Sequence, residues 1–115
     1  MPRPMYELMY IINPVLSDEQ TKNIVDRVRS FIAESGGEIL ETDELGSRRL
    51  AYPIEKKRNG YYVVTYFRAD GDLIAKLDRT LNITDDVLRH LTLRYDAKME
   101  RHYRKKQDAP APANA

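Results

Sequence analysis

The sequence predicts an α+β fold in which four strands and two helices follow one another in the order β-α-β-β-α-β. Three observations support this order. Extended, apolar or β-branched stretches occur at 5–12, 38–54, 61–68 and 87–95. Two other stretches, within 17–36 and 70–82, carry apolar residues at helical spacing. The length of 115 residues suits one domain with a single core.

The first strand is apolar on both faces, which is typical of a strand in the middle of a sheet. One face carries Tyr6, Leu8, Tyr10 and Ile12, and the other carries Glu7, Met9 and Ile11. Asn13-Pro14 ends this strand. Ser17 and Gln20 have the spacing of a capping box and predict the start of a helix, which Gly36-Gly37 ends. The buried stripe of this helix is Ile24, Val25, Val28, Phe31 and Ile32.

The second strand should lie at an edge of the sheet. Pro53 cannot donate a ladder hydrogen bond, and Gly46 predicts a bulge or bend. Asn59-Gly60 predicts the hairpin turn that leads into the third strand, 61–68.

The second helix can be capped by Asp70 or Asp72, and the last strand follows a turn at 82–86. The apolar stripe of this helix is Leu73, Ile74, Leu77 and Leu81. The last strand is expected to carry Val87, Leu91, Leu93 and Tyr95 on one face.

The whole order predicts a ferredoxin-like sandwich: a four-stranded antiparallel sheet with its first and third strands central and two helices on one face. Residues 1–97 would form this domain. Residues 98–115 would form a basic, then Ala/Pro-rich tail that is disordered without a partner.

Several classes of function are disfavoured by what the sequence contains. There is no cysteine, so disulfides and thiolate metal sites are excluded. His90 and His102 are far apart in the sequence, and we interpret both as surface residues. The sequence contains no phosphate-binding loop and no nucleophile motif. We therefore expect no enzyme, no metal and no cofactor. The N-terminal stretch does not have the pattern of a signal peptide and no apolar run could span a membrane, which predicts a cytoplasmic protein.

Charge is segregated along the chain although the net charge is only +1. Three basic and eight acidic residues give region 17–45 a net charge of −5, whereas regions 46–58 and 94–106 each carry +4. Two basic regions and one acidic region favour a polyanion partner bound on one side of the molecule.

The stretch KRNGYYVVTYF, residues 57–67, is similar to the RNA-stacking strand of RNA recognition motifs. Gly60, Tyr61, Val64 and Tyr66 fit that pattern. Tyr62 stands where the motif has a small residue, and Val63 stands where it has the second stacking aromatic residue. The match is weak, and a central strand whose aromatic residues pack on both faces is the better interpretation.

Three segments resemble ribosomal protein six of the bacterial small subunit, in order and over 5–94. They are the first strand YELMYIINP, the run GSRRLAYPI with the following GYY, and the stretch LNITDDVLRH. The run Arg-Arg-Leu-Ala-Tyr-Pro-Ile is the most specific of these.

The resemblance implies a ferredoxin-like, non-enzymatic protein. It also implies pairing with ribosomal protein eighteen and binding of the central domain of small-subunit ribosomal RNA. The implied partner-binding residues are Arg48, Arg49, Leu50, Ala51, Tyr52 and Pro53. The implied RNA-binding residues are Tyr6, Arg89 and Arg94, with Arg3 in place of basic residues that relatives carry just before the tyrosine.

Two other functions remain open on the sequence. An independent single-stranded RNA-binding module would use the open sheet face. A small-molecule role, such as that of the acylphosphatases that share this fold, would need a phosphate-binding loop and an arginine after the first strand, where this chain has Asn13-Pro14-Val15-Leu16.

Overall fold

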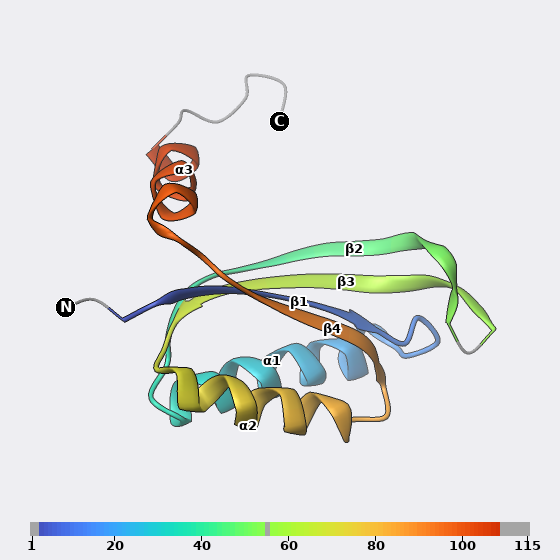
Figure 1. Cartoon of the computed structure of the whole chain (residues 1–115). Helices are drawn as coiled ribbons and strands as arrows, with labels where there is room; N and C mark the ends of the chain where they lie inside the picture. Colours follow the sequence, from blue (N-terminus) through green and yellow to red (C-terminus); the bar gives the residue numbers. More distant parts are fainter. Residues whose placement is uncertain (1–2, 55, 109–115) are drawn as a thin grey trace.

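The computed structural model describes residues 3–54 and 56–108. Their elements are β1 (Met5–Ile12), α1 (Asp18–Glu34), β2 (Glu38–Ile54), β3 (Lys57–Arg68), α2 (Gly71–Asn82), β4 (Val87–Arg94) and α3 (Ala97–Asp108). The strands form one sheet in the order β2-β3-β1-β4, and every neighbouring pair is antiparallel. Helices α1 and α2 cover one face of the sheet (Figure 1). This arrangement confirms the predicted ferredoxin-like fold, including the central first and third strands.

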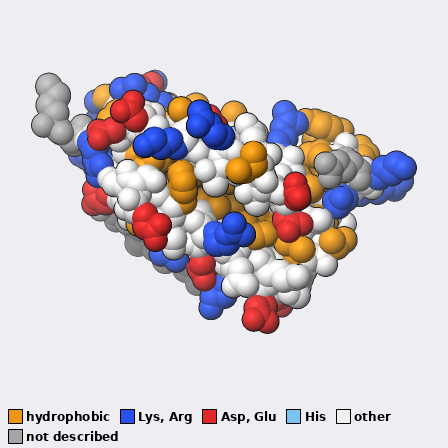
Figure 2. Space-filling model, turned by 90° about the horizontal axis from the view of Figure 1, so that it is seen from below, with side chains coloured by type: hydrophobic (Ala, Val, Ile, Leu, Met, Phe, Trp, Pro, Cys, Tyr) orange, Lys and Arg blue, Asp and Glu red, His pale blue; other side chains and the backbone are white. Residues whose placement is uncertain are grey.

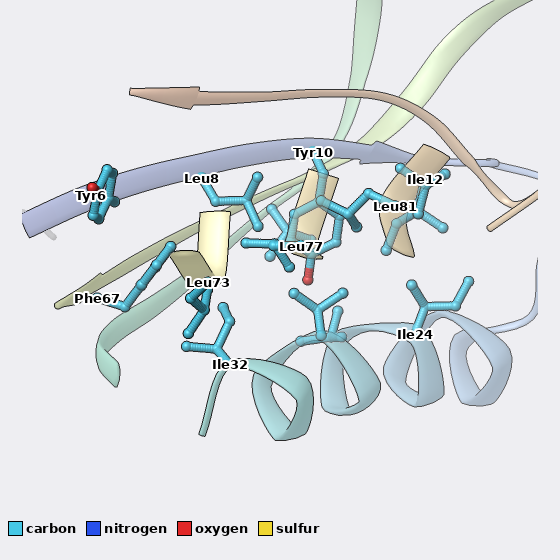
Figure 3. Packing of buried hydrophobic residues seen from close by; sticks show 14 of the residues in the cluster. Tyr6, Leu8, Tyr10, Ile12, Ile24, Ile32, Phe67, Leu73, Leu77 and Leu81 are labelled. Atoms are coloured by element: carbon cyan, nitrogen blue, oxygen red, sulfur yellow. The ribbon is translucent and has the colours of Figure 1, made fainter. Parts of the chain in front are cut away.

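The core lies between the sheet and these two helices. Alternate residues of β1 point towards the helices and meet the apolar stripes of α1 and α2 (Figure 3). Tyr6, Leu8, Tyr10 and Ile12 are all buried there, together with Val63 and Phe67 of β3. The predicted stripes of both helices are confirmed, with Phe31 and Ile74 only partly buried at their margins.

The boundaries of α1 follow from its local sequence. The Gln20 N–H donates to the Ser17 hydroxyl at 3.1 Å, and the Ser17 N–H donates to the Gln20 side chain at 2.9 Å. The helix ends before Gly36, whose φ of +93° is the left-handed conformation that glycine adopts without steric cost. Asp70 occupies the N-cap position of α2 but makes no side-chain capping bond.

The predicted hairpin turn at Asn59-Gly60 is wrong. Both residues lie inside β3, paired with Arg49 and Arg48 of β2, and the strands reverse after Ile54 through Lys56, whose φ is +67°. Gly60 is needed for packing instead. A Cβ atom at this position would lie 2.3 Å from Ile11 Cγ2 and 3.3 Å from Leu50 Cδ2.

Among the described residues the strand pairing shifts register at four places, and two of these shifts bear on the sequence predictions. The predicted irregularity at Gly46 is confirmed by a shift between Glu44 and Gly46 and by a φ of +85°. A second shift lies between the β1–β4 pairs Ile11–Arg89 and Ile12–Val87. It turns Val87 into the core, so the predicted grouping of Val87 with Leu91 and Leu93 on one face is wrong.

The chain beyond Tyr95 also differs from expectation. We expected disorder from Lys98 onward, but Ala97–Asp108 forms α3, which stands on the side of the sheet opposite α1 and α2 (Figure 1). The Met99 N–H donates to the Asp96 carboxylate at 2.8 Å, which caps the helix. The rest of the expected tail, 109–115, lies outside the described residues.

Aromatic rings and carboxylates hold α3 on the sheet. The Tyr103 ring lies 4.9 Å from the Tyr66 ring of β3, and its hydroxyl donates to Glu41 of β2 at 2.7 Å. The Arg68 guanidinium donates to the Glu100 carboxylate at 2.5 Å. The helix is therefore ordered by tertiary contacts that its basic composition does not reveal.

The tyrosines of this contact are held in their neutral form. Burial raises the pKa of Tyr103 above its ordinary value, and so do the hydrogen bond to Glu41 and the negative charge of that carboxylate. Burial likewise raises the pKa of Tyr95, whose hydroxyl donates to Glu7 at 2.5 Å. An ionised phenolate could not donate to these carboxylates and would be repelled by them.

The first prediction follows from the close packing around Gly60. Gly60→Ala should destabilise the fold by about 1–3 kcal/mol, because the new methyl group overlaps the buried Ile11 side chain. Gly71→Ala is the control, since a Cβ there has its nearest neighbour, the Tyr6 hydroxyl, only at 4.0 Å. Urea unfolding followed by circular dichroism compares the two. Equal midpoints for both variants would contradict this packing.

The second prediction concerns alkaline pH. Because the pKa values of Tyr95 and Tyr103 are raised in the folded state, their contribution to docking is fully present below the ordinary value of 10.0 and is lost as the pH rises through the raised values. Tyrosinate absorbance and helicity, followed upward from about pH 8 until ionisation is complete, should show a late group of tyrosines whose ionisation coincides with loss of helix. Tyr103→Phe should remove one tyrosine from that late group. A single titration step near the ordinary pKa would be the opposite result.

Candidate functional site

The face of the sheet opposite α1 and α2, called here the open face, is largely apolar. The register pairs Ile11 with Tyr62 and Arg89, and Met9 with Val64 and Leu91, so these side chains share that face. Leu91 is 63% exposed and Leu93 is 44% exposed. These two leucines therefore lie outside this chain's own core.

The β2–β3 hairpin overhangs the open face at the end remote from α3 (Figure 1). A hollow of about 270 Å³ lies beneath it, called here the hairpin groove. Its walls include Met9 and Ile11 of β1, Leu50 and Tyr52 of β2, Tyr62 of β3, and Arg89 and Leu91 of β4. All four strands thus contribute to one mostly apolar concavity.

The predicted partner-binding residues line the outer strand of this hairpin. Arg48, Arg49, Ala51, Tyr52 and Pro53 are all exposed, and Tyr52 is 54% exposed. Leu50 is different because it is only 8% exposed and packs inward beside Gly60. The structure therefore brings five of the six residues together on an accessible surface and makes the sixth part of the hairpin's own packing.

Arg89 borders the same groove. Its guanidinium lies 5.5 Å from the centre of the Tyr52 ring, a cation–π contact between β4 and the hairpin. The contact joins one residue predicted to bind RNA to one predicted to bind a partner protein. Arg89 consequently belongs geometrically to the hairpin groove.

Tyr6 is not placed to stack on a base from outside. It is 5% exposed, and its ring stacks on Phe67 with centroids 5.7 Å apart. Arg3 lies just before β1 and is half-buried, with its guanidinium donating to the Gly36 carbonyl. Both residues lie at the end of the sheet where β1 begins.

Arg94 lies at that same end, because it pairs with Tyr6 across the β1–β4 ladder. Arg94 is exposed and Arg89 lies five residues away, about 17 Å along an extended strand. The two arginines also face opposite sides of the sheet, since Arg89 pairs with Ile11 and Arg94 with Tyr6. The four predicted RNA-binding residues therefore do not form one patch.

Sequence reasoning missed the contact between α3 and the sheet. Glu7, Glu41, Tyr66, Tyr95 and Tyr103 come from five different elements or connections, and only tertiary structure brings them together. One signal was present in the sequence, the helical i, i+4 spacing of Met99 and Tyr103 within an otherwise basic stretch.

The helical side of the molecule has a hollow of about 640 Å³ between α1 and α2, with Ile24, Phe31 and Leu77 among the residues that line it. Figure 2 shows acidic and basic side chains interspersed there, without a large patch of one sign. Within residues 3–54 and 56–108, no group of three His, Asp or Glu side chains could hold a metal ion. In the same part of the chain, no helix is long and apolar enough to cross a membrane.

Comparisons with known proteins agree with this architecture. The family model of Ribosomal protein S6 matches residues 5–94. The chain is 47% identical over 91 residues to the small ribosomal subunit protein bS6 of Carboxydothermus hydrogenoformans, covering 79% of this chain and 95% of that protein. It is 48% identical, again over 91 residues, to the protein of the same name from Thermoanaerobacter pseudethanolicus, covering 79% and 96%.

A solved structure matches as well. The crystal structure of 30S ribosomal protein S6 from Thermotoga maritima superposes with a TM-score of 0.80 at 36% identity, covering 90% of this chain and 97% of that one. The chain belongs to the ribosomal protein S6 family, and it is therefore a cytoplasmic, ribosome-bound protein of the small ribosomal subunit.

Proposed function

We propose that this protein is a non-enzymatic constituent of the small subunit that binds the central domain of its ribosomal RNA together with ribosomal protein eighteen. The hairpin groove is the observation that carries this proposal. It is an apolar concavity with exposed Tyr52 and Leu91 at its margins, separate from the basic residues at the other end of the sheet. The apolar groove suits a protein partner, and the basic end of the sheet suits RNA.

The hairpin end has the composition of a protein-binding surface. Arg89 borders its apolar centre, and Arg48 and Arg49 are exposed on the same hairpin. Tyrosine and arginine are the residues that most often anchor protein interfaces. The edge of β2 also offers unpaired backbone groups that a partner strand or segment can cover. Ribosomal protein eighteen is the partner we assign to this end.

The opposite end suits RNA. Arg94 is exposed at the end of β4, and Arg3 lies beside the start of the adjacent β1. Guanidinium groups there can bind backbone phosphates, which position an RNA without reading its sequence. Tyr6 supports this end from within, by stacking on Phe67, rather than by contacting RNA. Arg89 we assign to the partner surface through its contact with Tyr52.

An independent single-stranded RNA-binding module is the less favoured function. Such a module needs aromatic rings exposed on its central strands. Here Tyr66 lies against Tyr103 of α3, and Tyr62 forms part of the groove wall. The two central strands therefore offer no free stacking platform among the described residues.

The third prediction tests the partner surface. Tyr52→Ala should leave the fold intact, because the side chain is mostly exposed, but should weaken binding of ribosomal protein eighteen roughly thirtyfold or more. Ile83→Ala is the matched control, since Ile83 is 75% exposed and lies in the turn after α2. Calorimetric titration of the purified pair measures both. Unchanged affinity for Tyr52→Ala would reject the hairpin groove as the partner site.

Leu50→Ala is expected to behave differently from Tyr52→Ala. Leu50 is buried against the hairpin, so its truncation should lower the thermal stability of the protein in addition to weakening the partner's binding. A Leu50→Ala variant with unchanged stability would show that Leu50 acts only at the interface.

The fourth prediction tests the RNA surface. Arg94→Ala should weaken binding of a central-domain RNA fragment by the pair, and should lower the slope of log affinity against log salt concentration by about 0.7–0.9. Arg27→Ala, on the exposed side of the acidic helix α1, should change neither quantity. Filter binding at several salt concentrations compares the two variants. Equal effects would place the RNA on another surface.

A further inference from the structure

Helix α3 has two distinct faces. Met99, Glu100 and Tyr103 are half-buried and form its anchor face, which packs against the sheet. Lys98, Arg101 and Lys105 recur at i, i+3 and i+7, the spacing of one stripe along a helix, and all three are exposed. These three residues define the basic face, and Arg104 and Lys106 flank it; all five cations are exposed. Lys98 also borders a hollow that Glu7 and Tyr66 of the sheet line.

The anchor contacts do not use the basic face. The Arg68–Glu100 ion pair and the Tyr103–Glu41 hydrogen bond hold the helix, whereas none of the five cations is paired with another described residue. The acidic groups near the start of α3 are already engaged, because Glu100 accepts from Arg68 and Asp96 accepts from the Met99 N–H. The positive charge of the exposed side is therefore not neutralised within the described part of the chain.

Hydrogen bonds also fix the position of α3 at one end of the sheet. Tyr95, directly before it, donates its backbone N–H to the Met5 carbonyl at 2.8 Å. The Arg68 guanidinium bridges the Arg3 carbonyl at 2.8 Å and the Glu100 carboxylate at 2.5 Å. These bonds place α3 at the end of the sheet that carries Arg3 and Arg94, remote from the hairpin groove (Figure 1). The basic face thus lies at the same end of the sheet as the surface proposed above for RNA, while Arg94 points to the other side of the sheet.

We propose that the basic face of α3 is a second RNA-binding site, which takes backbone phosphates through Lys98, Arg101 and Lys105. This inference rests on the proposed function, because it takes RNA to be the polyanion that binds the helix. The choice of RNA follows from charge and position. Five exposed cations of α3 lie at the arginine end of the sheet, and among the described residues their face offers no apolar centre for a protein partner. Arg68, Glu100 and Tyr103 are positioning residues, because they hold the helix and leave its cations free to contact phosphate.

The test is a triple substitution in the full chain, Lys98→Gln with Arg101→Gln and Lys105→Gln. Glutamine keeps helix propensity close to that of lysine and arginine, so α3 should remain folded and docked. The matched control is Lys22→Gln with Arg27→Gln and Arg29→Gln, which removes the same number of exposed positive charges from α1. Circular dichroism should give the same helicity for both variants.

Each variant is paired with ribosomal protein eighteen and titrated with the central-domain RNA fragment over a range of salt concentrations. The α3 variant should lose about two units of the log–log salt slope and bind about tenfold more weakly at moderate salt, while the α1 control stays near the wild type. Affinity for ribosomal protein eighteen without RNA should not change. An α3 variant that matches the control in slope and affinity would mean that the basic face is only solvated, and one that loses the protein partner instead would mean that it binds protein.

A second RNA separates this proposal from the one on which it rests. If the wild-type pair does not bind the central-domain fragment, the proposed function fails. The same variants are then titrated against an unrelated double-stranded RNA of equal length, because phosphate contacts do not depend on sequence. A reduced slope for the α3 variant alone would still support the basic face, and equal slopes would overturn it.

Discussion

The structure depends on one constraint, an apolar sheet that its two main helices cover on one face only. Strand β1 is apolar on both sides because it lies in the middle of the sheet, between β3 and β4. Its residues Tyr6, Leu8, Tyr10 and Ile12 are buried beneath α1 and α2, while Met9 and Ile11 point the other way. Exposure of Met9 and Ile11 to water is unfavourable, so other parts of the molecule must reduce the exposed area of these side chains.

The chain covers the open face in two different ways. At the end where β1 begins, α3 lies over Tyr66 and is held by carboxylates on β1 and β2 and by the arginine on β3. At the other end the β2–β3 hairpin bends over Ile11, which is possible because residue 60 has no side chain. The hairpin leaves a groove rather than a sealed core, and Leu91 and Tyr52 remain exposed beside it. The incomplete cover is what makes this end suitable for a protein partner.

This division gives each end a separate chemistry. The α3 end combines half-buried tyrosines that are held neutral with exposed cations on the helix. The hairpin end combines an apolar hollow with Arg89 in its wall and with exposed arginines on β2. A small protein that must hold both RNA and another protein benefits from such separation, because phosphate binding and apolar docking place opposite demands on desolvation. The long sheet keeps the two surfaces apart while coupling them through the same strands.

The sequence by itself determined the elements and their order. The capping residues at Ser17 and Gln20, the glycines after α1, the apolar stripes of both helices and the edge position signalled by Pro53 all act locally, so they could be recognised from neighbouring residues. Resemblance in three segments was enough to identify the family. The stretch proposed to bind the partner is accessible, apart from Leu50.

Only the tertiary structure decided which side chains meet. Asn59-Gly60 has the local pattern of a turn, but Gly60 serves the approach of Ile11 from a strand distant in sequence. A single register shift reverses the facing of Val87, because strand side chains alternate and one displaced residue changes the face. Arg89 and Arg94 lie on opposite faces because five positions separate them on a strand whose side chains alternate, and they lie near opposite ends of that strand. Helix α3 is ordered by Tyr66, Glu41 and Arg68, which lie 30 or more residues earlier in the chain, and local composition carries no information about contacts at that range.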